Sequence, residues 1–284
     1  MLTEKEWQSF HAARKARAQQ VGKAIYLLDG NGEPIMEISE YTDLSAPQAD
    51  AELSSLKLTV PIDVEYGDRH PLVHELVAEN LGVQDDEGRL KLAKTKTRMV
   101  LVEHKNGARF CYRITHVVAS GGHLYPTELE INGVDTTSIL SRLPAFSVRL
   151  SVSGVWRRLA NDYGRIFEKE RDIQTFEVAK IADGFTKSGR ADEVITQIIR
   201  ESLDALYKAF NITRDVDKPY TVRRVQKGRN SPVAYITLKD DDILSTIKNA
   251  AESAGVGIRS TMVFPYEGDS SVLAPQIIFI VSQR

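Results

Sequence analysis

The stretch ELEINGVDTTSILSRLPA, residues 128–145, changes from a strand to a short apolar helix within eighteen positions. Asp135, with Thr136 and Thr137 behind it, is expected to satisfy the exposed amides at the start of the helix. Pro144 is expected to end the helix. The stretch therefore predicts a sharp turn of the chain at the end of the last strand of a β-rich domain.

The bulk composition indicates an ordinary globular protein. Its 284 residues are enough for a sizeable core and for about two domains. Hydrophobic residues make up 42% and charged residues 27%, which excludes the disordered, collagenous and membrane classes. The 37 Lys and Arg and 39 Asp and Glu give a formal net charge of -2. No overall positive field therefore favours binding to nucleic acid or membranes.

The single cysteine and the lack of long apolar runs indicate in which cellular compartment the protein is made. Cys111 is the only cysteine, so an intrachain disulfide and a multi-cysteine zinc site are excluded. It lies in RFCYRITHVV and is predicted to be a buried small hydrophobe. No run approaches the roughly 18 apolar residues of a membrane span, and the first 20 residues lack a signal-peptide core. We expect synthesis in a reducing cytoplasm and no membrane span.

The first segment predicts a helix. Residues 3–20 are rich in good helix formers, and Val21-Gly22 provides a stop. The apolar face is thin, since Trp7 and Phe10 are its only large side chains. Two interpretations are possible: a loosely docked terminus, or an arm on a neighbouring subunit with Trp7 and Phe10 as anchors.

Residues 23–134 read as a series of short strands. Glycines in GNGEP, between KAIYLLD and IMEISEY, suit a hairpin, and Asn106-Gly107 joins two apolar runs into another. HPLVHELVAENLG predicts a short helix that begins at Pro71 and ends at Gly82. About seven strands at this spacing predict a small antiparallel barrel or sandwich.

The later residues predict helices and then strands again. Apolar side chains from Val155 to Ala179 recur three or four apart, and residues 191–210 form a cleaner amphipathic pattern. PYTVRRVQ and VAYITL then predict a hairpin. It is followed by the helix DDILSTIKNAAESAG, capped by Asp241 or Asp242 and ended by Gly255, and by two more strands.

The predicted fold class is therefore α+β, in four segments. They are a helical arm (1–22), a β-rich barrel or sandwich (23–150), a helical segment (151–214) and a smaller ββαββ domain (215–284).

Candidate chemical sites are few. His70 and His74 stand four apart, with Asp68 and Glu75 nearby, but Pro71 places His70 before the helix, so surface histidines are favoured over a metal site. DGNGEPIMEISE begins like a calcium loop but has proline where that loop needs glycine. The sequence contains no phosphate-binding loop, nucleophile elbow or His-Glu-x-x-His helix. We expect no catalytic residue, cofactor or metal ion.

One basic cluster stands out. Arg223, Arg224, Lys227 and Arg229 fall on the predicted hairpin beside Tyr220. They are interpreted as an exposed rim, or as a surface for an acidic partner or for nucleic acid passing nearby.

The order of these motifs resembles that of tail-tip proteins from long-tailed, siphovirus-type bacteriophages. The resemblance includes the YLLDGNGEPIMEI hairpin, the LKLTVP strand, RFCYRITHVV, and INGVD followed by SILSRLP; DDILSTIKNAAESAGVGI resembles the family's second barrel-like domain. It covers residues 23–145 and 215–284, and neither the N-terminal arm nor the central segment belongs to it.

The resemblance implies a structural virion protein rather than an enzyme. Baseplate hub and minor tail proteins of this kind have a tube-like barrel and form rings, typically trimers. Such rings join the tail tube to a central fibre or spike and let DNA pass without sequence-specific binding. The protein would be made in the host cytoplasm and work in the virion beside other tail proteins. From the residue patterns described above, we expect Trp7, Phe10, Arg223 and Arg224 to lie at subunit interfaces of such an assembly.

Two alternatives remain open. One is the distal tail ring protein, which would form hexamers. The other is a cytoplasmic enzyme or ligand-binding protein with a site around His70, His74 and His116.

Overall fold

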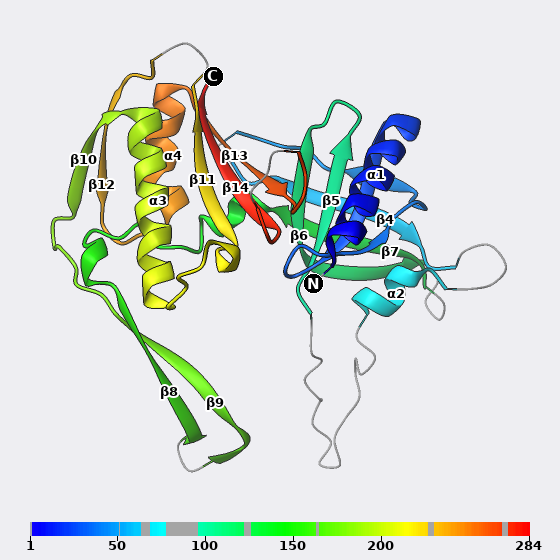
Figure 1. The fold of residues 1–284 in the computed structure, drawn as a ribbon, viewed down its shortest axis with the longest axis horizontal. Helices are drawn as coiled ribbons and strands as arrows, with labels where there is room; N and C mark the ends of the chain where they lie inside the picture. Colours follow the sequence, from blue (N-terminus) through cyan, green and yellow to red (C-terminus); the bar gives the residue numbers. More distant parts are fainter. Residues whose placement is uncertain are drawn as a thin grey trace. The chain divides into compact units, whose positions relative to one another are not determined.

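The computed structural model describes residues 2–50, 52–63, 69–77, 96–121, 126–162, 165–226, 230–268 and 272–284. The chain divides into two compact units. Unit 1 comprises Met1–Ser138 and Ser260–Ile277, and unit 2 comprises Ile139–Arg259 and Ile278–Arg284. Both combine helices with β-sheet (Figure 1), and the predicted α+β class is confirmed.

Unit 1 is built on a seven-stranded sheet in the order β2-β1-β5-β6-β7-β4-β3. Each neighbouring pair is antiparallel. The strands are β1 (Lys23–Asp29), β2 (Pro34–Glu37), β3 (Asp43–Ser45), β4 (Ser55–Pro61), β5 (Arg98–His104), β6 (Arg109–Gly121) and β7 (Pro126–Asp135). The β1–β2 and β5–β6 hairpins confirm the two predicted turns, and Gly107 has the positive φ of 81° that the second requires.

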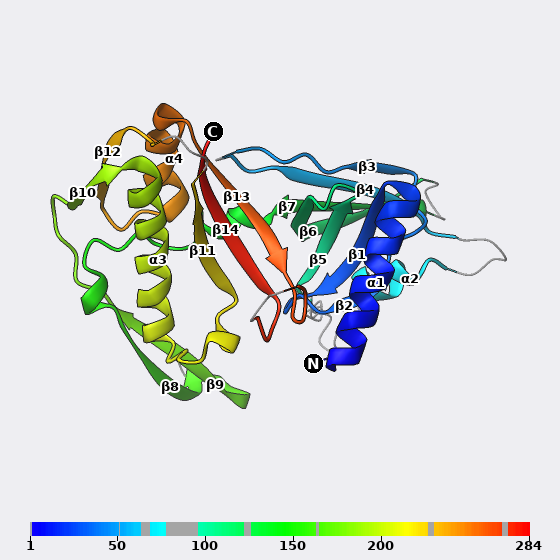
Figure 2. The same ribbon diagram turned by 45° about the horizontal axis from the view of Figure 1, so that its top comes forward.

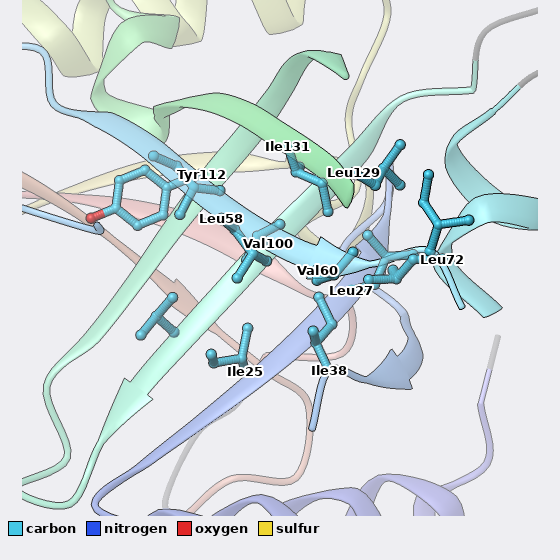
Figure 3. Close-up of a cluster of buried hydrophobic side chains, with 13 residues drawn as sticks. Ile25, Leu27, Ile38, Leu58, Val60, Leu72, Val100, Tyr112, Leu129 and Ile131 are labelled. Carbon is cyan, nitrogen blue, oxygen red and sulfur yellow. The ribbon is translucent and has the colours of Figure 1, made fainter. Parts of the chain in front are cut away.

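One apolar cluster shows that this sheet is rolled. Ile25 and Leu27 of β1 belong to the same buried cluster as Leu58 and Val60 of β4 (Figure 3), although three strands separate β1 from β4. Leu44, on the edge strand β3, also packs against this cluster. A flat sheet would hold these side chains far apart, so the sheet curls around its own core.

The opposite face of the sheet is covered by α1 (Glu4–Val21), which lies against β1 in Figures 1 and 2. Thr3 and Glu6 form a capping box at its start, and Gly22 ends it in the left-handed conformation. The predicted helix is therefore confirmed, although it belongs to unit 1. The short helix α2 (Pro71–Leu76) begins at the predicted proline, and its predicted end at Gly82 lies outside the described residues.

The 128–145 stretch is the point at which the chain passes from unit 1 to unit 2. As predicted, the Asp135 carboxylate accepts a hydrogen bond from the Thr137 amide at 2.8 Å. The predicted helix, however, is only a single 3-10 turn, Thr136–Ile139. The carbonyls of Leu140 and Leu143 accept instead from the first amides of α4 (Ile243–Ala254). The chain therefore caps another helix rather than extending its own.

Unit 2 holds two longer helices, two two-stranded sheets and most of a three-stranded sheet, whose strands β13 and β14 also contribute residues to unit 1. The amphipathic α3 (Ala191–Ala209) and α4 are confirmed, and Asp242 and Gly255 cap α4 as expected. The sheets pair β10 (Phe185–Arg190) with β12 (Val233–Leu238), β8 (Ser153–Asp162) with β9 (Arg165–Glu177), and β14 (Gln276–Gln283) with both β11 (Tyr220–Val225) and β13 (Val256–Val263). The order of elements after residue 215 is ββαββ, as predicted.

Two local predictions in this half are wrong. The apolar residues from Val155 to Ala179 do not form a helix, and most of them lie in the β8–β9 hairpin. Their three-to-four spacing does not mark the buried face of a helix, because these side chains are largely exposed. The hairpin predicted between β11 and β12 does not form either. β12 pairs with β10 because its residues Ile236 and Leu238 are buried on the side where α3 and α4 pack.

The rolled core of unit 1 predicts a large cost for a cavity at Leu58, which is fully buried. We expect Leu58→Ala to reduce the free energy of unfolding by about 2 to 5 kcal/mol. Urea denaturation followed by Trp7 fluorescence in a Trp156→Phe background measures this. Leu53→Ala, at an exposed position, is the control and should change it by less than about 0.5 kcal/mol.

Candidate assembly surface

The histidines and the cysteine that were candidates for a catalytic or metal site do not gather into such a site in the described part of the chain. His70 is buried, and its Nδ1 accepts a hydrogen bond from the Leu72 amide at 3.1 Å, so this residue caps α2. His74 and His116 are exposed. Among the residues that the structure describes, no three His, Cys, Asp or Glu side chains form a group able to hold a metal. Burial raises the pKa of the Cys111 thiol to about 12, which agrees with a buried hydrophobe rather than a nucleophile.

Trp7 and Phe10 do not form a free surface. Trp7 is only 3% exposed and its ring lies 5.6 Å from that of Phe264, which follows β13. The Phe10 ring lies 5.1 Å from Tyr26 of β1 and 5.4 Å from Phe264. The prediction that these two residues anchor a neighbouring subunit is therefore corrected: both anchor α1 to the core of its own unit.

Beneath these rings lies an arginine–glutamate cluster, formed by Arg14, Glu103, Arg109 and Glu267. The fully buried Arg14 places Nε 2.8 Å from Glu103 Oε2 and Nη2 2.6 Å from Glu267 Oε1. Arg109 contacts the same two carboxylates, at 3.0 Å and 2.7 Å. Both guanidinium groups also lie over the Phe264 ring, at 4.9 and 5.3 Å. The cluster joins α1, the sheet and the segment after β13.

The electrostatics of this cluster favour its ionised form. Burial by itself raises the pKa of the Glu267 carboxyl, but the hydrogen bond from Arg109 and the charges of both arginines outweigh it. The pKa of Glu267 therefore lies below its ordinary value of 4.5. The buried Arg14 and the partly buried Arg109 thus face two carboxylates, a charge pairing that fits a structural role, although Arg14 Nε and Nη1 donate no hydrogen bond.

The predicted basic cluster is only partly a surface. Arg224 forms ion pairs with Asp192 and Glu193 at the start of α3, which fix its guanidinium within unit 2. Arg223 is exposed on β11. Lys227 and Arg229 lie outside the described residues.

The described surface carries its exposed large apolar side chains mainly in unit 2. They are Leu150, Val155, Trp156, Ile166, Ile173, Phe176, Val178, Ile181, Phe185, Phe210, Val233 and Tyr235. The β8–β9 hairpin extends away from α3 (Figure 1), and no further strand pairs with it in the described sheets. Ile166, near its tip, is 86% exposed. A two-stranded ribbon with apolar side chains in water is marginally stable by itself, so this hairpin is suited to contact another surface.

The hairpin is anchored on one face and open on the other. Gln174 donates a hydrogen bond of 2.7 Å to the Ala209 carbonyl at the end of α3, and the Phe176 ring lies 5.1 Å from Phe210. On the alternate face, Val155 stands opposite Thr175 and Ile173 stands opposite Arg157, two cross-strand pairs further along. Side chains alternate between faces in a strand, so Val155 and Ile173 share the face that α3 does not anchor.

A second open surface belongs to the β10–β12 sheet. Its inward residues face α3 and α4, whereas Val233 and Tyr235 lie on the alternate face and are 63% and 76% exposed. Sequence reasoning missed both surfaces. The VAYITL pattern predicted the strand but not its partner, and the helical interpretation concealed the hairpin.

Comparison with known proteins shows no family. No protein-family model matches the chain, and no curated protein matches it. Among solved structures, the chain is similar to the tail protein from Neisseria meningitidis MC58, at 12% identity and a TM-score of 0.38. The alignment covers 92% of this chain and 50% of that one, so the chain spans half the length of that structure. A likeness this loose carries no argument about function. No helix in the described part of the chain is long and apolar enough to cross a membrane.

Loss of one arginine from the cluster should destabilise unit 1 strongly. We expect Arg14→Met to lower the free energy of unfolding by about 3 to 5 kcal/mol, because the buried Glu103 and the partly buried Glu267 then keep only Arg109 of the two arginines. Urea denaturation followed by Trp7 fluorescence measures it. Arg17→Met is the matched control: its pair with Glu37 is about one-third exposed, so its loss should cost less than about 1 kcal/mol.

His11 predicts acid sensitivity of α1. Its Nε2–H donates to the Pro265 carbonyl at 2.8 Å, and burial, reinforced by the charges of Arg14 and Lys15 and opposed by Glu267, lowers its pKa from 6.5. The His11 imidazole is therefore protonated at a higher pH in the unfolded chain than in the folded chain, so acid favours the unfolded state. The contribution of neutral His11 to the free energy of unfolding is fully present above the unfolded pKa and is lost as the pH decreases through the lower folded pKa.

The free energy of unfolding should thus decrease as the pH falls below about 7.5, and His11→Gln should lessen the decrease, since an amide does not titrate here. An unchanged pH profile in this variant would contradict the role of His11.

Proposed function

We propose that this chain is a structural protein of a bacteriophage tail, a component of the tail tip or baseplate hub. It would assemble into a ring that links the tail tube to a central fibre or spike and lets DNA pass. Its action would depend on contacts between subunits and with other tail proteins rather than on catalysis. This proposal combines the motif order in the sequence with one structural feature.

The β8–β9 hairpin is the observation that carries the assembly part of the proposal. Exposed strand edges are templates for pairing with other chains, and monomeric proteins usually shorten, charge or cover them. Here a long hairpin keeps Val155, Trp156 and Ile166 exposed. The rolled sheet of unit 1 supports the comparison with a tail barrel, because its core is enclosed by strands from both ends of the sheet.

The molar mass of the purified chain in solution, which gives the number of subunits, tests the proposal. We expect the purified chain to form an oligomer whose population increases with concentration, measured by light scattering, and to show rings with a central opening in negative-stain images. Three subunits would support the hub, and six would favour the distal tail ring instead. A monomer at every concentration would contradict assembly by this chain.

A further inference from the structure

We propose that a pocket at the start of β1 binds the C-terminal carboxylate of a peptide that ends in an aliphatic residue. The pocket lies wholly within unit 1 and has a volume of about 370 Å³. Basic and apolar side chains share its lining, which includes Arg17, Val21, Lys23, Ile25, Ile38 and Tyr41. Neither the site nor its ligand depends on the proposed function.

The pocket lies where the chain departs from β1. β2 ends one residue before Ile38, whose amide donates a hydrogen bond of 2.9 Å to the Ile25 carbonyl. β1 itself extends further back, to Lys23, where it pairs with β5 on its other side. The three residues after Ile38 form no strand, and in the described part of the chain the amides of Ser39 and Tyr41 donate to no other residue. This segment therefore has backbone donors to offer to a ligand.

The inner part of the pocket is apolar. Ile25 and Ile38 are each 2% exposed and belong to the core cluster of the rolled sheet (Figure 3). Val21, at the end of α1, adds an apolar side chain that is 51% exposed. Ligand pockets range from about 300 to 1,000 Å³, so this one suits a short aliphatic side chain with its carboxylate rather than a long ligand.

The charged groups of the pocket favour an anion. The Lys23 ammonium lies 5.2 Å from the centre of the Tyr41 ring and, among the described residues, forms no ion pair with a carboxylate. Arg17 pairs through Nε with Glu37 at 2.8 Å, and both side chains are about one-third exposed. The lining itself contains two cations and no carboxylate. A bound carboxylate therefore meets two opposite charges, whereas a bound cation would be repelled.

The backbone donors favour a peptide over a simple fatty acid. Both ligands have a carboxylate and an aliphatic group. Only a peptide also has amide carbonyls, which accept hydrogen bonds from an extended segment such as Ser39–Tyr41. Capture of a terminal carboxylate together with pairing to exposed backbone is a recurring mode of peptide recognition.

Peptide binding to the full chain tests the inference. The probe is the fluorescein-labelled peptide Gly-Ser-Gly-Ser-Leu with a free carboxylate, and the comparison is the same peptide with a C-terminal amide. We expect fluorescence polarisation to show saturable binding of the acid form, and binding of the amide form that is at least about 10-fold weaker, because the charge-assisted hydrogen bonds are lost. Lys23→Gln should weaken binding of the acid form by a similar factor.

Lys15→Gln is the matched control, since this lysine is exposed on α1 and does not line the pocket. It should bind the acid form like the unmodified chain, and circular dichroism establishes that both variants are folded. The inference is wrong if the acid form shows no saturation by about 1 mM, if the amide form binds equally well, or if Lys23→Gln has no effect.

Hexanoate separates the two sources of an aliphatic carboxylate. We expect it to displace the peptide only weakly, because it cannot accept hydrogen bonds from the backbone amides. If hexanoate binds more tightly than the peptide, the assignment of a peptide ligand is contradicted. None of these outcomes alters the test of self-assembly, which rests on the molar mass of the chain in solution.

Discussion

The complete burial of the Arg14 guanidinium constrains unit 1 more than any other single interaction. A charge without water requires opposite charges and hydrogen bonds from its surroundings. Glu103 of β5 and Glu267 after β13 provide the opposite charges, Glu267 accepts a hydrogen bond from Arg14, and Arg109 balances the carboxylates. Because these residues are far apart in the sequence, the first helix, the sheet and the returning segment must all be in place before the cluster is neutral. This cluster makes α1 part of the core.

Unit 2, in contrast, leaves large apolar side chains exposed on its surface. Its helices bury their own apolar faces, yet the β8–β9 hairpin and the outer face of β12 leave aromatic and aliphatic side chains in water. Exposed apolar area of this extent is stabilised when another surface covers it. These exposed side chains of unit 2 are the part of the chain on which the proposed assembly rests.

The accuracy of the sequence predictions followed the range of the interactions involved. The caps of α4 at Asp242 and Gly255, the stop of α1 at Gly22 and the turn at Asn106-Gly107 were predicted correctly, because each depends on residues within a few positions. The candidate interface was not. Trp7 and Phe10 stood on a thin helical stripe that gave no sign of Phe264. The Val155 to Ala179 segment matched helical spacing although its strands pair with each other.

The sequence by itself determined the α+β class, the positions of most strands and the ends of the main helices, since backbone preferences and apolar alternation are local properties. Only the tertiary structure decided that one face of α1 is buried, that β12 pairs with β10 instead of β11, and that the β8–β9 hairpin is exposed. These outcomes depend on which distant surfaces exclude water from one another. A single strand or helix pattern has no information about its partner, and burial is set by that partner.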